Sequence, residues 1–175
     1  MWRGSKVEKQ NKIMLKIEKG FTLIEVLIVV AIIGILASVV LVGLGPTQRA
    51  GRDARRISDL RQTQNALELY FNKCGYYPGT VQANPPPCGA YAANNTWGDA
   101  VSGMTQALIG SAIGVSQIPN DPTSGKTYYY GANAVGSSYV VGAKLEDSGN
   151  QALSQDIDGT VNGVDCADPV YCVQL

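Results

Sequence analysis

The sequence predicts an α+β protein in which one long N-terminal helix, transmembrane in its first half and amphipathic in its second, packs on a small antiparallel β-sheet. Three observations support this prediction: a long apolar run near the N-terminus, an apolar stripe at helical spacing after it, and short β-branched and aromatic runs late in the chain. Such patterns predict helix and strand, respectively. A chain of 175 residues is long enough for an anchor and one domain.

The apolar run extends from about residue 20 to about residue 45. Residues 26–48 include no charged side chain. At 1.5 Å per residue, about 20 helical residues span roughly 30 Å, the thickness of the hydrocarbon core of a bilayer. The run therefore predicts a transmembrane helix. A plain single-pass anchor fits this run, and so does a secretory signal peptide cleaved near the small residues Gly43 and Gly45, although a signal-peptide core has only roughly 7–15 apolar residues.

A basic leader precedes the apolar run. Residues 1–20 carry six Lys or Arg residues and two Glu residues, a net charge of +4. Positive charge keeps the adjacent end of a transmembrane helix in the cytoplasm, so the chain beyond Arg49 is expected to lie outside. Glu25 lies within the apolar run. Because an unpaired carboxylate at the centre of a membrane costs about 2.5–3.5 kcal/mol, Glu25 is a candidate functional residue.

Residues 20–25 read GFTLIE, between the basic leader and the apolar run. This arrangement resembles the processing site and N-terminal helix of type IV pilins and type II secretion pseudopilins. The resemblance implies cleavage after Gly20 by a prepilin peptidase, N-methylation of Phe21 and a role for Glu25 in assembly. Cleavage would give Phe21 a free α-amino group that is mostly protonated at neutral pH. That group could pair with Glu25 of a neighbouring subunit at low dielectric, which would offset the desolvation of both charges.

The resemblance also implies a pilin-like lollipop fold of four segments. These are a leader at residues 1–20, a transmembrane and filament-core helix at 21–45, its amphipathic continuation at 46–75 and an exported globular head at 76–175. The implied function is a structural subunit of a type IV pilus or a type II secretion pseudopilus. The alternative is a minor or tip pilin that acts as a binding module, either an adhesin or a DNA-uptake receptor.

The implied localisation is the cytoplasmic membrane, with the N-terminus inside, followed by an extracytoplasmic filament. The implied partners are other copies of the chain, minor pilins, the prepilin peptidase, an inner-membrane assembly platform and the lipid bilayer. Translation from Met14 instead of Met1 would give a seven-residue leader. Both starts remain open.

Composition limits the possible activities. Without residues 1–20, the chain has 8 basic and 12 acidic residues, a net charge of −4. No nucleic-acid partner is predicted, because such a surface needs clustered Lys and Arg. The chain has no histidine and no nucleophile motif, which argues against an enzyme. No cofactor is required for the predicted role, and calcium is the one candidate.

All four cysteines follow the apolar run, as expected for a protein of an oxidising compartment. Four cysteines allow three pairings. Proximity in the sequence favours Cys74 with Cys88 and Cys166 with Cys172. Free buried thiols are the alternative.

Residues 53–73 are expected to continue the helix. Ile57, Leu60, Leu67 and Phe71 form one apolar stripe at the helical period. The opposite, polar side is predicted to be a solvated or headgroup-level face, formed by charged residues: Arg52, Asp53, Arg55, Arg56, Asp59 and Arg61. Pro46 removes a backbone donor, so a kink or local melting is expected there.

The remainder of the head is predicted to contain a short helix at 104–113 and two strands, 127–130 and 138–145, that form a hairpin. A third strand is expected at 170–173. Tyr128, Tyr129 and Tyr130 are expected to pack in the sheet rather than to form a ligand platform.

An acidic segment near the C-terminus matches the ligand spacing of an EF-hand. Oxygen-bearing side chains occupy positions 1, 3, 5, 7, 9 and 12 of a twelve-residue frame, with Gly159 at position 6: Ser154, Asp156, Asp158, Thr160, Asn162 and Asp165. The frame lacks the usual first aspartate, the usual final glutamate and flanking helices. Major pseudopilins of type II secretion, as a family, hold calcium in a C-terminal loop. The segment is therefore either a calcium site formed by Asp156, Asp158 and Asp165 or a solvated acidic loop.

Overall fold

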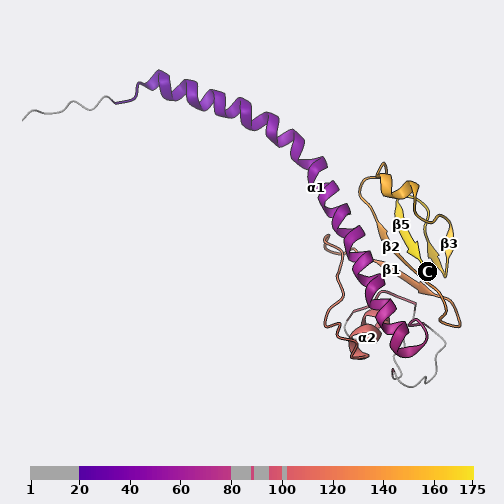
Figure 1. Cartoon of the computed structure of the whole chain (residues 1–175). Coiled ribbons are helices and arrows are strands. Elements are labelled where there is room, and N and C mark those ends of the chain that lie inside the picture. Colours follow the sequence, from indigo (N-terminus) through magenta and orange to yellow (C-terminus); the bar gives the residue numbers. More distant parts are fainter. Residues whose placement is uncertain (1–19, 80–87, 89–94, 100–101) are drawn as a thin grey trace, which may run out of the picture. The chain divides into compact units, whose positions relative to one another are not determined.

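The structure, a computed structural model, describes residues 20–79, 88, 95–99 and 102–175. The chain divides into two compact units, Met1–Val42 and Gly43–Leu175. Figure 1 shows the order of the elements: a long helix first, then a short helix, and then the strands. This is the predicted α+β, pilin-like arrangement.

Helix α1 extends over Leu23–Cys74. In the first unit its large apolar side chains are exposed, by between 49 % at Val29 and 82 % at Leu23. An 18-residue stretch of α1 has a mean hydropathy of 3.1, and none of that stretch is buried. By length and composition, α1 is the one helix among the described residues that could cross a membrane.

In the second unit α1 continues through Pro46 without interruption. The predicted local melting at this proline is therefore wrong. Because proline has no backbone N–H group, one hydrogen bond of the helix is lost at Pro46. Next to this position, the hydroxyl of Thr47 donates to the carbonyl of Gly43 at 3.1 Å. The helix ends at Cys74, and Gly75 adopts a φ of 81°, a left-handed conformation that favours glycine.

The main sheet has three antiparallel strands in the order β1-β2-β5: β1 is Tyr129–Ala132, β2 is Tyr139–Lys144 and β5 is Val170–Gln174. Tyr130 pairs with Val141, and Val141 pairs with Val173. The hairpin and the third strand were predicted, but β1 continues two residues further than expected. Gly131 permits this, because a Cβ there would overlap the carbonyl oxygen of Asn162.

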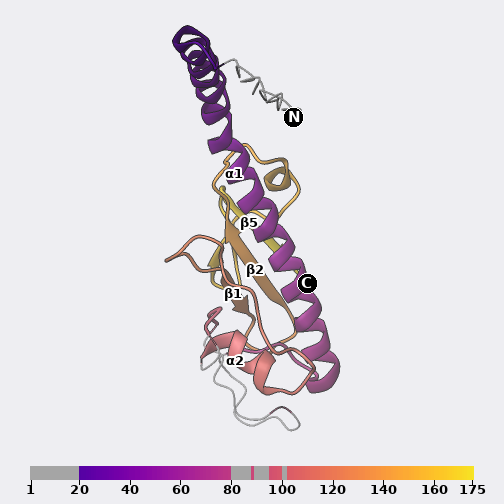
Figure 2. The same cartoon turned by 90° about the vertical axis from the view of Figure 1, so that its left-hand side faces the viewer.

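The second half of α1 lies along the main sheet, and helix α2, Gly103–Gly110, lies near the C-terminal end of α1 (Figure 2). The ammonium group of Lys73 donates to the carbonyl of Ser111 just after α2. A short 3₁₀ helix, η1 at Gln151–Ser154, precedes a two-stranded sheet formed by β3 at Thr160–Val161 and β4 at Val164–Asp165.

One face of α1 is buried along its whole packed length. Its residues recur at alternating intervals of three and four, which places them on one side of the helix: Asp53, Arg56, Leu60, Thr63, Leu67, Tyr70 and Cys74. Leu60 and Leu67 were predicted to be in the core and are fully buried, whereas Ile57 and Phe71 are only partly buried. The predicted stripe is therefore correct at Leu60 and Leu67, but the buried face of α1 is rotated from it toward the polar residues.

The predicted solvated face is wrong for Asp53, Arg56 and Asp59, which are all buried. It holds for Arg55 and Arg61, which are exposed. Burial of these charges is possible because each has a polar or charged partner, either on α1 itself or in the head, as described below.

Candidate functional site

The N-terminal motif forms the start of α1. Thr22 lies just before the helix, and its hydroxyl accepts a hydrogen bond from the amide of Glu25 at 3.3 Å. The carbonyl of Thr22 accepts from the amides of Glu25 and Val26. Thr22 is therefore an N-cap that satisfies amides left without partners in the first turn. Gly20 and Phe21 precede the helix in non-helical backbone and are exposed.

Glu25 occupies the third helical position, in the first turn of α1. A Thr followed three residues later by Glu is the capping-box pattern, so this glutamate also suits the positive end of the helix dipole. This structural role was not predicted, although the T-x-x-E spacing indicates it. Among the residues that the structure describes, no cation contacts the carboxylate of Glu25. Its charge is therefore available to a partner outside the described chain.

Three carboxylates meet in the C-terminal loop. Oxygen atoms of Asp156, Asp158 and Asp168 all lie within 4.8 Å of one another. Oδ2 of Asp156 accepts from the amide of Cys172 at 2.8 Å, while its Oδ1 is buried without a hydrogen-bond partner. Burial, and then the charges of Asp158 and Asp168, raise the pKa of Asp156. An unsatisfied buried oxygen beside two further carboxylates suits a hard cation such as calcium.

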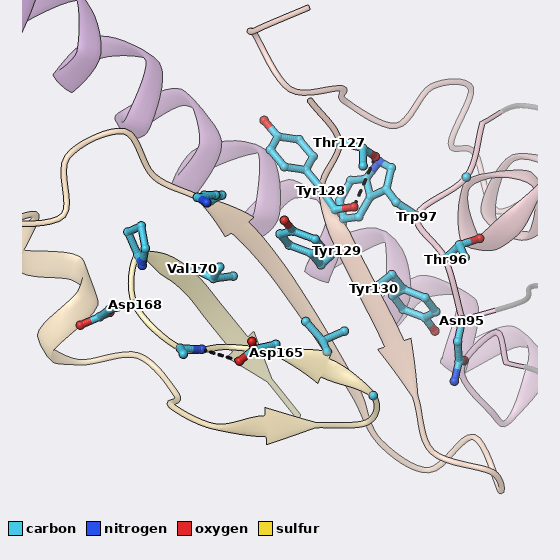
Figure 3. Close-up of a pocket in the computed structure, with 16 residues that line it drawn as sticks. Asn95, Thr96, Trp97, Thr127, Tyr128, Tyr129, Tyr130, Asp165, Asp168 and Val170 are labelled. Atoms are coloured by element: carbon cyan, nitrogen blue, oxygen red, sulfur yellow. Dashed lines mark hydrogen bonds between the residues drawn. The ribbon is translucent and has the colours of Figure 1, made fainter. Parts of the chain in front are cut away.

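The structure corrects one member of the predicted ligand set. Asp165 lies outside the cluster, and its Oδ1 accepts a hydrogen bond from the amide of Ala167, separate from Asp168 (Figure 3). The EF-hand frame fails because residues 160–165 form the β3–β4 hairpin instead of a ligand loop. Asn162 and Gly163 form its two-residue turn, with φ of 47° and 82°. An Asn-Gly pair between two valines is a strong hairpin signal that the sequence offered.

The cysteines pair sequentially, as predicted: Cys74 with Cys88 and Cys166 with Cys172. The second disulfide encloses Asp168 and places the amide of Cys172 against Asp156. The disulfide therefore holds Asp168 and the amide of Cys172 close to Asp156.

Comparison with known proteins agrees with the geometry of the N-terminal motif. Residues 15–41 match the prokaryotic N-terminal methylation motif. The type II secretion system core protein G of Klebsiella pneumoniae is 33% identical over 100 residues, which cover 54% of this chain and 71% of that protein. The chain belongs to this family of pseudopilins.

Two further relatives match over a shorter stretch of the chain. The core protein G of Escherichia coli is 37% identical over 65 residues, and that of Aeromonas hydrophila is 38% identical over 65 residues. Each match covers 37% of this chain, and it spans 45% and 46% of the two relatives, less than half of their length. No solved structure matches the chain.

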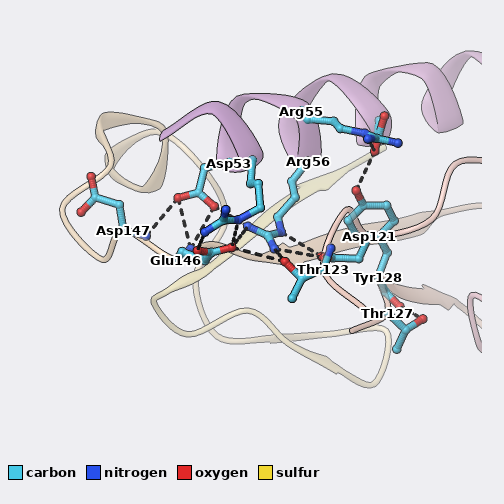
Figure 4. A network of polar contacts seen from close by, with 11 residues as sticks. Asp53, Arg55, Arg56, Asp121, Thr123, Thr127, Tyr128, Glu146 and Asp147 are labelled. Carbon is cyan, nitrogen blue, oxygen red and sulfur yellow. Dashed lines mark hydrogen bonds and ion pairs between the residues drawn. The ribbon is translucent and has the colours of Figure 1, made fainter. Parts of the chain in front are cut away.

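The head of this pseudopilin is attached to α1 by a buried arginine. All five N–H groups of Arg56 have acceptors (Figure 4). Nε and Nη2 donate to the two oxygens of Asp121 at 2.8 and 3.0 Å, and Nη2 also donates to Thr123 at 2.8 Å. Nη1 contacts Asp53 at 2.7 Å and Glu146 at 3.0 Å. We call these five residues the Arg56 cluster.

The Arg56 cluster fixes both ends of the β1–β2 hairpin to the helix. Asp121 and Thr123 precede β1, and Glu146 follows β2. Asp53 also accepts hydrogen bonds from the backbone amides of Glu146 and Asp147 at 2.9 and 3.0 Å. The turn after β2 is thereby attached to the first packed turns of α1.

Hydrogen bonds within the Arg56 cluster stabilise the charged form of its carboxylates. Hydrogen bonds from Arg52, and then from Arg56, lower the pKa of Glu146 to about 2. Burial raises the pKa of Asp121, but hydrogen bonds from Arg56 and the amide of Thr123 outweigh it, so the net shift is downward. Both carboxylates are therefore charged at neutral pH. One helical turn further on, Asp59 accepts from the hydroxyl of Tyr128 at 2.7 Å.

Proposed function

We propose that this chain is a structural, non-enzymatic subunit of a type II secretion pseudopilus. The observation that carries the proposal is the first unit. An apolar helix with exposed side chains begins within the matched motif and holds a single carboxylate in its first turn. Such a surface is stable only in a bilayer or against other apolar helices. A pseudopilin uses both environments, first as a membrane protein and then as part of a filament core.

The proposed sequence of events begins in the cytoplasmic membrane, with the leader inside. A prepilin peptidase cleaves after Gly20, Phe21 is N-methylated, and an assembly platform adds the subunit to a filament of other copies and minor pseudopilins. Small residues at 34, 37, 38 and 43 allow neighbouring helices to approach closely. The names of the relatives favour secretion over a retractable pilus or a DNA-uptake filament.

The first test concerns processing. We expect the exported protein to begin at Phe21, as measured by N-terminal sequencing and intact mass. Gly20→Leu should leave the leader attached, whereas Gly20→Ala should be processed in part. A Cβ at Gly20 would meet nothing within 4 Å, so these substitutions act on the peptidase and leave the fold unchanged. A chain that begins at Pro46 would instead indicate a signal peptidase and would contradict the proposed function.

We also propose that Asp156, Asp158 and Asp168 hold a calcium ion that stabilises the head. Calcium at 100-fold above its dissociation constant would add about 2.7 kcal/mol to the free energy of unfolding. At roughly 2–4 °C per kcal/mol, the full chain in neutral detergent should melt about 5–10 °C higher in calcium than in chelator. Magnesium should substitute poorly, because it requires a smaller, strictly octahedral set of ligands.

Two matched variants test whether calcium is held by the three carboxylates that the structure brings together or by the predicted EF-hand ligands. Asp168→Asn should abolish the calcium-dependent rise in melting temperature, and Asp165→Asn should retain it. Equal melting of the unsubstituted chain in calcium and in chelator would reject the calcium site. The loop would then be a solvated acidic turn held by Cys166 and Cys172.

A further inference from the structure

Most of the positive charge of the processed chain lies around one groove. Of the eight Lys and Arg residues after position 20, five line a groove of about 870 Å³: Arg49, Arg52, Arg56, Lys126 and Lys144. Only two carboxylates line it, Asp121 and Glu146. The remainder of the processed chain is strongly acidic by comparison. We call this feature the basic groove.

The carboxylates of the basic groove are already engaged. Asp121 is bound by Arg56, and Glu146 is bound by both Arg52 and Arg56. Arg49, Lys126 and Lys144 are exposed, and none of them has an ion-pair partner among the residues that the structure describes. Three cations are therefore left to face an external anion.

The groove opens beside the part of α1 that directly follows the apolar run. Arg49 comes four residues after Gly45, which corresponds to about 6 Å along a helix. Charged residues at this distance from a hydrocarbon-spanning segment lie at the depth of the lipid headgroups. Tyr129, which is 38 % exposed, also lines this groove and borders a second groove, shown in Figure 3. An exposed tyrosine beside lysines is typical of a membrane interface.

We propose that the basic groove binds the phosphate headgroup of an anionic phospholipid while the subunit is anchored in the membrane. The inference rests on the membrane-anchored stage of the proposed function. Lys126 and Lys144 would contact the phosphate as mobile ammonium groups, and Arg49 would approach it from α1. Arg52 and Arg56 would add a background positive potential while remaining paired. An acidic loop of a second copy is the competing occupant, but it reaches the groove only after assembly, whereas headgroups surround Arg49 from insertion onward.

The test uses the full chain in neutral detergent micelles, titrated with short-chain phosphatidylglycerol. Amide resonances of Gly125, Lys126 and Lys144 should shift saturably. Phosphatidylcholine of the same chain length should shift them far less, and inorganic phosphate should bind more weakly than phosphatidylglycerol. Each lysine near an anionic headgroup is worth about fivefold in affinity, so the variant K126Q/K144Q should bind roughly 25-fold more weakly. Arg61→Gln is the matched control, because Arg61 is exposed on α1 but does not line the groove.

Several results would overturn the proposal. Equal shifts with phosphatidylcholine and phosphatidylglycerol would remove the preference for an anionic headgroup, and equal affinity for inorganic phosphate would indicate a free-anion site. Shifts that depend on protein concentration without lipid would assign the groove to a second copy. Insertion of the same variants into vesicles is measured separately by resistance to carbonate extraction. Failure to insert would contradict the proposed function, whereas normal insertion without headgroup preference would contradict only the groove.

Discussion

Replacing Arg56 with methionine should lower the free energy of unfolding of the head by about 3–5 kcal/mol, the usual cost of removing one partner from a buried ionic network. Methionine fills a similar volume but leaves Asp53 and Asp121 without their cation. The side chain of Asp121 is only 3 % exposed, and that of Asp53 is not exposed at all. Water therefore cannot replace the lost charge. A domain of this size has only about 5–15 kcal/mol of total stability, so the head should be close to unfolding at physiological temperature.

The neighbouring arginine provides the control. Arg55 contacts Asp59 at 3.7 Å, and its side chain is 62 % exposed. Arg55→Met should therefore cost less than about 1 kcal/mol. Arg56→Lys should give an intermediate loss, because lysine keeps the charge but cannot bind Asp121 with two parallel hydrogen bonds.

Denaturant unfolding can be followed in the processed chain by the fluorescence of Trp97, which is the only tryptophan after residue 20 and is 2 % exposed. Equal losses from Arg55→Met and Arg56→Met would mean that the Arg56 cluster contributes no special stability.

The Arg56 cluster also shows which contacts could not be predicted from this sequence. The apolar stripe identified the buried face near Leu60 and Leu67, because apolar periodicity is a local signal. Charged residues are expected to be exposed unless a partner is known. The partners of Arg56 come 65 and 90 residues later in the chain, at Asp121 and Glu146. No local pattern connects them, so the burial of Arg56 could not be foreseen.

The acidic loop shows the same contrast between local and distant information. Asp156 and Asp158 were predicted as ligands from their EF-hand spacing, and the structure brings their carboxylates together. Asp168 completes the cluster only because the β3–β4 hairpin folds back and the Cys166–Cys172 disulfide closes the following turn. The EF-hand frame counted residues along the chain and so selected Asp165. The N-terminal motif was easier to interpret because its residues are contiguous in the sequence and no tertiary contact is needed to bring them together.

Replacing Glu25 with valine should leave membrane insertion intact and prevent filament assembly. Insertion should be unaffected or improved, because a carboxylate is removed from an apolar helix. In the proposed filament, Glu25 pairs with the α-amino group of Phe21 in a neighbouring subunit at low dielectric. Loss of one partner from such a pair costs about 3–5 kcal/mol, which corresponds to roughly 10²- to 4 × 10³-fold in the assembly equilibrium. The measurement is the yield of sheared filaments from cells that contain no unsubstituted copy.

Glutamine at position 25 separates this charge pairing from the capping role of Glu25. Thr22 and Glu25 have capping-box spacing, and glutamine can serve at the third helical position as glutamate does. Glu25→Gln therefore keeps a side chain suited to the capping-box position but removes the charge, whereas Glu25→Val removes both that side chain and the charge. If the pairing with Phe21 drives assembly, both variants should fail to form filaments. Normal filaments from Glu25→Gln together with none from Glu25→Val would assign the residue to helix capping, and normal filaments from both would leave Glu25 without a role in assembly.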